Sequence, residues 1–262
     1  MDPTARFAEL VRGPEDRLSL DEAALLIAAH ADPGLDVDAE LRVIDGLAAG
    51  ISDPTLAGWR RHLFVELGFS GNVGNYYDPA NSFLHQVVRR RLGLPITLSV
   101  LGMEVGRRIG LRLQGVGMPG HFLLRHTPDA LADVFVDPFD EGRVFGRDGC
   151  LERFRAVNGP DTPFREAYLD PIGGVAILSR MLNNLASIYS ASGRTEALEW
   201  VLRLRVALPG SLPAERREWA LTLGATGRFV EAAVALEGLV EALPGDEEHL
   251  RKAASAFRAR LN

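Results

Sequence analysis

Residues 93–140 read GLPITLSVLGMEVGRRIGLRLQGVGMPGHFLLRHTPDALADVFVDPFD, and this stretch decides the fold of the middle of the chain. Residues 95–109 are apolar on nearly all sides, which predicts a buried helix that begins at Pro95. Over residues 112–138 the pattern alternates, as in Phe122 and Leu124, which predicts strands. The stretch therefore predicts an α+β core, in which one buried helix precedes a small antiparallel sheet.

Two polar side chains lie at the ends of the predicted strands. His121 follows the turn formed by Pro119 and Gly120 and opens one strand, whereas Asp137 closes the next. If these strands pair in antiparallel fashion, the two side chains can face each other across the ladder. A carboxylate that holds an imidazole in one tautomer and orientation is part of a nucleophilic catalytic site. The spacing permits such a dyad.

The composition limits the class of protein. The chain has 262 residues, of which 47% are hydrophobic and 24% charged, and we favour two domains over one. No segment is apolar for long enough to span a membrane, so we expect no association with a membrane. The start, MDPTARFAELVRG, lacks the pattern of a signal peptide, so we expect a cytoplasmic protein. The net charge of −6 gives no basic footprint for nucleic acid. Because the chain has a single cysteine, Cys150, an internal disulfide framework is excluded.

Three stretches divide the chain. Residues 1–70 carry apolar residues at helical spacing and predict a helical segment packed on the core. Residues 71–170 form the mixed core, in which residues 83–92 predict a second helix. Residues 174–262 are helical and contain an internal echo, with Gly193 and Gly227 at equivalent places 34 positions apart. That period is typical of helix-turn-helix tetratricopeptide repeats.

The middle of the chain resembles a known superfamily. The segments GLP before an apolar helix, RRIGL, GVGMPGHFLLR and VDPFD resemble the papain/transglutaminase-like core. More narrowly, NYYDPANSFLHQVVRRRLGLPITLSV with PGHFLLR is similar to the SirB-type subgroup, which usually carries tetratricopeptide-like helices at the C-terminus. The resemblance implies that His121 and Asp137 match the catalytic histidine and aspartate. Counted back from Gly110, the position of the catalytic cysteine falls on Pro95, so the nucleophile has no counterpart.

Other side chains are alternatives for the missing nucleophile. Thr97 and Ser99 lie on the predicted helix, but a buried hydroxyl more often bonds to the carbonyl oxygen four residues earlier. Cys150 follows the predicted sheet, and it serves only if its loop folds back over His121. We therefore expect a vestigial dyad and no functional nucleophile, with Ser99, Cys150 or water kept as the alternative.

Further polar residues are candidates for a cleft. Asn75, Asn81 and Ser82 can line it, although turn formation explains them equally well, and Asp78 before Pro79 predicts a cap for the following helix. Glu104 is the sole charge between Leu92 and Gly106; it is either paired with Arg107 and Arg108 or placed beside His121. Neither metal-ligand spacing nor a nucleotide-binding motif occurs, so no metal and no cofactor are expected.

Three functions are compatible with these patterns. We prefer a non-catalytic transglutaminase-like protein that binds a peptide or protein in a regulatory role, through the His121/Asp137 cleft together with the C-terminal repeats. The second is a hydrolase or acyl-transfer enzyme that uses the dyad with water, Ser99 or Cys150. The third is an assembly scaffold, in which only the repeats bind.

Overall fold

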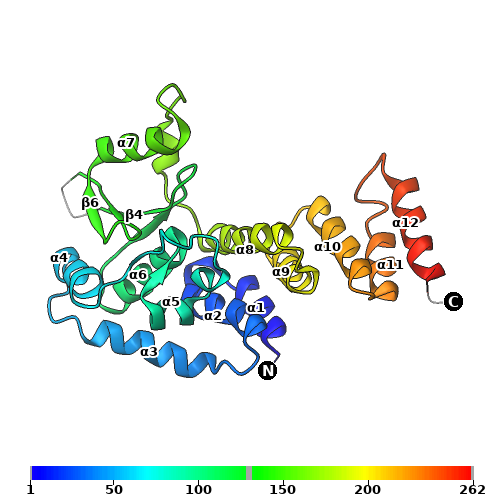
Figure 1. Ribbon diagram of the computed structural model, residues 1–262, viewed down its shortest axis with the longest axis horizontal. Helices are drawn as coiled ribbons and strands as arrows, with labels where there is room; N and C mark the ends of the chain where they lie inside the picture. Colours follow the sequence, from blue (N-terminus) through cyan, green and yellow to red (C-terminus); the bar gives the residue numbers. More distant parts are fainter. Residues whose placement is uncertain (1, 128–131, 261–262) are drawn as a thin grey trace. The chain divides into compact units, whose positions relative to one another are not determined.

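The computed structural model describes residues 2–127 and 132–260, and these form two compact units (Figure 1). One unit runs from Glu15 to Met181, and the other combines the residues up to Pro14 with those from Leu182 onward. Most of the predicted N-terminal helical segment therefore shares a unit with the core. Its first helix instead joins the C-terminal helices, because α1 (Pro3–Arg12) packs on α9 (Thr195–Ala207).

Helix α6 (Pro95–Arg108) is the central helix of the Glu15–Met181 unit, and its bounds agree with the predicted 95–109. Its neighbours pack on all sides, which accounts for its apolar sequence. Gly102 allows the closest approach: the indole of buried Trp59 donates from Nε1 to the Gly102 carbonyl oxygen at 3.1 Å, and a Cβ on Gly102 would lie 2.8 Å from that ring. The helices around α6 are α2 (Leu20–Ala31), α3 (Val37–Ala49), α4 (Leu56–Arg60) with its π-helical continuation η2 (Arg61–Glu66), and α5 (Leu84–Arg90).

The predicted antiparallel sheet is present, with strand order β3–β4–β5–β6. Two of its strands, β4 and β6, are labelled in Figure 1. Its strands are β3 (Gln114–Val116), β4 (Leu123–His126), β5 (Val134–Asp137) and β6 (Arg143–Phe145). The register pairs Leu124 with Val136, and Asp137 ends β5 as expected. His121 does not open β4: its backbone N–H donates to Met118 within a turn that Gly120 enters at a φ of 77°, so the ladder begins two residues later. Residues 128–131 of the predicted strand stretch lie outside the described residues, and β6 was not predicted.

A second, two-stranded sheet joins the segment after η2 to the segment before α6. Strand β1 (Ser70–Gly71) pairs in parallel with β2 (Leu92–Gly93), which directly precedes α6. Asp78 caps the 3-10 turn η3 (Pro79–Ser82) rather than α5, because the chain turns again at Phe83 before α5 begins. After the sheet come α7 (Arg147–Asn158) and η4 (Glu166–Leu169), and η1 (Glu15–Arg17) precedes α2.

The other unit is helical and contains the sequence echo. Its helices are α1, the end of α8 (Gly174–Ala191), α9, α10 (Pro213–Ala225), α11 (Phe229–Glu237) and α12 (Glu247–Ala259). Gly193 and Gly227 adopt φ values of 65° and 83° at equivalent helix ends, a conformation that glycine reaches without strain. Each is followed by a helix, so both copies are helix-turn-helix units; their assignment as tetratricopeptide repeats stays a prediction. Residues 261–262 lie outside the described part.

Candidate functional site

His121 and Asp137 form a hydrogen-bonded pair in the structure. His121 Nε2 lies 2.7 Å from Asp137 Oδ2. The Asp137 side chain is fully buried, whereas the imidazole keeps an exposed edge. The other carboxylate oxygen, Oδ1, accepts the backbone N–H groups of Phe139 at 3.0 Å and Asp140 at 3.3 Å. The turn that follows β5 therefore fixes the carboxylate, and the carboxylate fixes the ring.

Arg153 completes this cluster from α7, and sequence reasoning did not find it. Its Nη1 lies 2.9 Å from Asp137 Oδ2, and its Nη2 bonds to Asp140. The guanidinium also stacks over the ring of Phe145, with its Cζ 4.9 Å from the ring centroid. One carboxylate oxygen of Asp137 thus receives both an imidazole and a guanidinium. No local pattern marks this residue, because α7 meets β5 only in the folded chain.

Pro95 is the first residue of α6, and the hydroxyl groups behind it are engaged by the backbone. Ser99 Oγ donates to the Pro95 carbonyl oxygen at 2.7 Å, the bond to the fourth preceding residue that the sequence favoured. Thr97 Oγ1 donates to the carbonyl oxygen of Asn81 at 2.6 Å and accepts the Leu94 N–H at 3.0 Å. Neither hydroxyl bonds to His121.

The segment at Gly71 brings the first turn of α6 near the dyad. The Gly71 N–H donates to the Phe139 carbonyl oxygen at 3.0 Å, and the next N–H, of Asn72, donates to Gly93 at 3.1 Å. A Cβ on Gly71 would lie 2.4 Å from the Phe139 ring, so only glycine fits between them. Phe139 lies two positions after Asp137, and Gly93 lies two positions before Pro95. Both therefore bond to the same short segment, residues 71–72.

Asn81 holds the loop that covers this segment. Its buried Nδ2 donates to the carbonyl oxygens of Asn75 at 2.7 Å and Tyr76 at 3.1 Å, and its Oδ1 accepts from Asn72 Nδ2 at 2.9 Å. Asp78 caps η3 and pairs with Arg90 at 3.0 Å. Of the predicted cleft residues, Asn75, Asp78, Asn81 and buried Ser82 thus lie in one loop, and hydrogen bonds of Asn75, Asp78 and Asn81 shape its backbone.

Aromatic residues join this loop to the dyad. The Phe139 ring stands edge-on to both His121, with centroids 6.4 Å apart, and Tyr76, with centroids 5.9 Å apart. Tyr77 packs edge-on against Tyr76. Burial, followed by the neighbouring Tyr77, raises the pKa of Tyr76 above its ordinary value. The side chains of Val73 and Tyr77 are 78% and 77% exposed, so this loop presents apolar groups to solvent.

Cys150 is fully buried in the hydrophobic core. It packs with Met118, Leu123 and Phe154 in a buried cluster under α7. Burial raises the pKa of the thiol to about 12. Because only the thiolate is a strong nucleophile, a thiol with this pKa disfavours Cys150 as the missing nucleophile at neutral pH.

Glu104 lies toward the opposite end of α6 from Pro95, so the structure does not place it beside His121. Nine residues separate the two positions, which is roughly 13 Å along a helix. Its carboxylate accepts from Arg107 Nε at 2.8 Å and Arg108 Nη1 at 3.3 Å, as the salt-bridge interpretation predicted, and from the Leu20 N–H at 3.2 Å.

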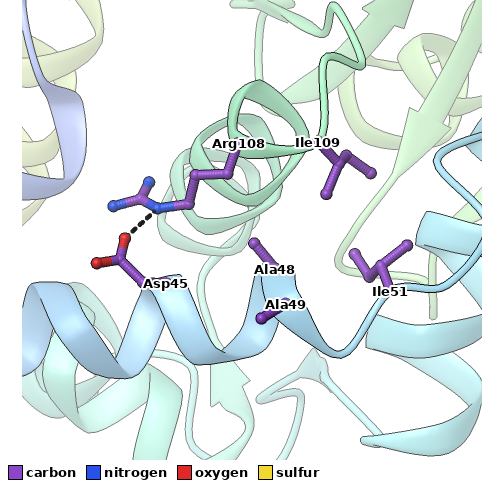
Figure 2. Close-up of a pocket in the computed structure, with 6 residues that line it drawn as sticks. All are labelled: Asp45, Ala48, Ala49, Ile51, Arg108 and Ile109. Carbon is purple, nitrogen blue, oxygen red and sulfur yellow. Dashed lines mark hydrogen bonds and ion pairs between the residues drawn. The ribbon is translucent and has the colours of Figure 1, made fainter.

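Arg108 also connects this network to a surface pocket. It contacts buried Asp21 at 2.6 Å and Asp45 at 2.7 Å. Figure 2 shows the pocket, of about 360 Å³, with the Arg108 and Asp45 pair on one side and apolar side chains on the other. Its lining consists of Asp45, Ala48, Ala49, Ile51, Arg108 and Ile109. None of the predicted site residues lines it.

Replacing Glu104 by glutamine is expected to flatten the pH dependence of folding stability. Burial, and after it the charge of Asp21, raises the pKa of Glu104 above its ordinary value of 4.5. The stability that this group contributes is therefore complete below pH 4.5 and declines as the pH rises through the higher folded pKa. Urea unfolding at a series of pH values should show that decline weakened in Glu104→Gln and kept in a control, Glu152→Gln, at an exposed position. Equal slopes in the two variants would contradict the prediction.

Residues 2–127 and 132–260 contain neither a membrane-spanning helix nor a metal-binding cluster of side chains. None of the helices there has the length and apolarity that a membrane crossing requires. Within those same ranges, His, Cys, Asp and Glu side chains do not gather in groups of three or more that could hold a metal ion.

Comparison with known proteins identifies the class. Residues 35–183 match the transglutaminase-like superfamily, and this match covers more than half of the chain. The chain therefore belongs to the transglutaminase-like superfamily, in agreement with its buried α6 and its His121/Asp137 pair. No solved structure matches it significantly.

Individual relatives identify the chain more narrowly, as a homologue of the UPF0162 proteins. The UPF0162 protein of Xylella fastidiosa is 39% identical over 192 residues, which is 69% of this chain and 68% of the relative. The UPF0162 protein of Pseudomonas aeruginosa is 34% identical over 183 residues, or 67% of this chain and 66% of the relative. F-box only protein 21 of Homo sapiens is 38% identical over 138 residues, covering 50% of this chain and 21% of that protein.

Proposed function

We propose that this chain is a non-catalytic, SirB-type member of its superfamily that binds a polypeptide in a regulatory role. The observation that carries the proposal is the start of α6: proline occupies the position that the resemblance gives to the nucleophile, and it has no reactive side chain. The nearby hydroxyls of Thr97 and Ser99 are bonded to backbone oxygens, and Cys150 is a buried thiol with a raised pKa. In this proposal the dyad therefore has no use of Thr97, Ser99 or Cys150, the candidate nucleophiles considered among the described residues.

The binding surface in this proposal consists of Val73, Tyr76 and Tyr77, next to Phe139 and His121; we call it the tyrosine surface. Tyrosine is enriched at protein interfaces because it offers a large apolar area and a polar tip at low entropic cost. Phe139 and the bonds of Asn81 hold this surface in place. Preorganisation of this kind reduces the cost of binding.

Selection from a random peptide library, followed by fluorescence anisotropy with the purified chain, tests the proposal. We expect Tyr77 to be a hot spot of this surface, where truncation costs about 2 kcal/mol or more, so Tyr77→Ala should weaken binding of the selected peptides by more than about tenfold. The control Val65→Ala removes an exposed apolar side chain from η2 and should bind like wild type. Failure to enrich peptides, or equal binding by Tyr77→Ala, would overturn the proposal.

A second candidate function is favoured by one specific observation, the intact pair of His121 and Asp137 at 2.7 Å. An imidazole held in this way can serve as a general base toward a bound water. A hydrolase or acyl-transfer activity that the wild type shows and His121→Ala abolishes would establish this function and refute the non-catalytic one. Rapid labelling of one residue by a fluorophosphonate or iodoacetamide probe would lead to the same conclusion.

The C-terminal helices provide a further surface for the same binding role. Val230 and Val234 are one turn apart on α11 and both are exposed, as is Leu221 on α10. Deleting residues 182–262 tests whether the helices carry binding, as the scaffold hypothesis requires, and it leaves the Glu15–Met181 unit intact. Because α1 packs on α9, that deletion should also remove residues 1–14.

A further inference from the structure

We propose that the pocket beside Asp45 binds a short alkylammonium group, from a free amine or from a lysine side chain, with its nitrogen on the Asp45 carboxylate. The pocket lies within the Glu15–Met181 unit, between the C-terminal ends of α3 and α6 (Figure 2). Its volume of about 360 Å³ is near the lower end for small-molecule sites, which span roughly 300 to 1,000 Å³. The tyrosine surface does not contribute to its lining, so this proposal is independent of the proposed function.

Asp45 supplies the acceptor for the charged end of the ligand. Its side chain is 62% exposed, and its Oδ1 accepts from Arg108 Nε at 2.7 Å. A carboxylate has about four lone-pair sites, so this one bond leaves it capacity for further donors. An ammonium group brings three donors and a positive charge, and hydrogen bonds between ionised groups are the strong ones.

Arg108, the other charged group of the lining, is already engaged by oxygens of the chain, which disfavours an anionic ligand. Besides the bond of Nε to Asp45, its Nη1 donates to the Glu104 carbonyl oxygen at 3.0 Å, and its Nη2 contacts buried Asp21 at 2.6 Å. Asp21 and Asp45 place two negative charges against the one positive charge of Arg108. Arg107 offsets the charge of Glu104. The balance of charge on this side of the pocket therefore favours a cation.

The rest of the lining suits a hydrocarbon chain. Figure 2 shows Ala48, Ala49, Ile51 and Ile109 on the side away from the charged pair. The two alanines leave space at the end of α3 because their side chains are short. Burial of a carbon chain against this wall adds affinity in proportion to the apolar area removed from water. A ligand with one cationic end and a short apolar body thus matches both sides of the pocket.

An NMR titration of the purified full chain with n-butylamine at neutral pH tests the proposal. Butylamine should shift the methyl signals of Ala48, Ile51 and Ile109 to saturation, with a Kd on the order of millimolar for so small a ligand. The neutral probe n-butanol and the anionic probe butyrate should bind at least about tenfold more weakly, because neither combines donors with a positive charge. Equal binding of the three probes, or tighter binding of butyrate, would overturn the proposal.

A lysine derivative blocked at both backbone ends distinguishes the two sources of the ammonium group. If it shifts the same methyl signals as butylamine, the pocket accepts a lysine side chain of a polypeptide. If butylamine alone binds, the ligand is a free amine. Absence of binding by both would refute the proposal, whatever peptides the tyrosine surface selects.

Three variants locate the site. Asp45→Asn keeps an oxygen for Arg108 but loses the charge, so it should weaken butylamine binding by at least about tenfold. Ala49→Leu fills the pocket from an exposed position and should abolish binding. Both positions are exposed, so the variants should fold like wild type. The matched control Asp38→Asn removes a carboxylate from α3 about two turns before Asp45 and should bind like wild type. Unchanged binding in Asp45→Asn or Ala49→Leu would place the amine elsewhere and overturn the proposal.

Discussion

Asp137→Ala should lower the free energy of unfolding by about 3 kcal/mol, because it leaves Arg153 without its buried partner. The substitution also releases the backbone N–H of Phe139, which the carboxylate accepts at present, whereas the N–H of Asp140 keeps its bond to the backbone carbonyl oxygen of residue 137. An orphaned buried donor costs about 1 kcal/mol or more by itself. The imidazole of His121 loses the contact that orients it, so peptide binding at the tyrosine surface should weaken as well.

Urea denaturation, with fluorescence or circular dichroism as the signal, measures this effect. Asp140→Ala is the appropriate comparison, since Asp140 also pairs with Arg153 but is half-exposed and does not contact His121. It should cost less than about 1 kcal/mol, as exposed ion pairs do. Equal losses in the two variants would mean that Asp137 acts only as another surface partner of Arg153.

Local sequence rules predicted the parts of the site that lie within single elements. Pro95 begins α6 because a proline suits the first position of a helix, and Ser99 bonds back along the same helix. The alternating pattern identified β4 and β5, and their antiparallel pairing brings His121 to Asp137. In each case the relevant partners are close in sequence or in adjacent strands.

Partners from different elements could not be predicted in this way. Arg153 reaches Asp137 from α7, beyond an unpredicted strand, and Glu104 meets Asp21 through a guanidinium that serves both. Hydrophobic periodicity determines which face of an element is buried but does not determine which other element covers it. For the same reason the contact between Phe139 and Tyr76 could not be predicted. That contact depends on Gly71 lying against the ring of Phe139.

Asn81→Ala should have the second large effect, a loss of about 3 kcal/mol in the free energy of unfolding. The buried amide bonds to three groups: the carbonyl oxygens of Asn75 and Tyr76, and the side chain of Asn72. Each buried group left unpaired costs about 1 to 3 kcal/mol, reduced where the loop can admit water. Because these bonds hold Tyr76 against Phe139, the tyrosine surface should lose its arrangement before the rest of the unit unfolds.

Hydrogen exchange separates this local effect from a general one. In Asn81→Ala the backbone amides of residues 72–78 should exchange faster than in wild type, by at least about tenfold if one bond is lost, whereas the amides of α6 change only with global stability. Asn75→Ala is the matched control: it removes an asparagine side chain from the same loop but keeps the backbone carbonyl that Asn81 binds. If both variants exchanged alike, the buried amide would not be what orders the loop, and the case for a preformed binding surface beside His121 would fail with it.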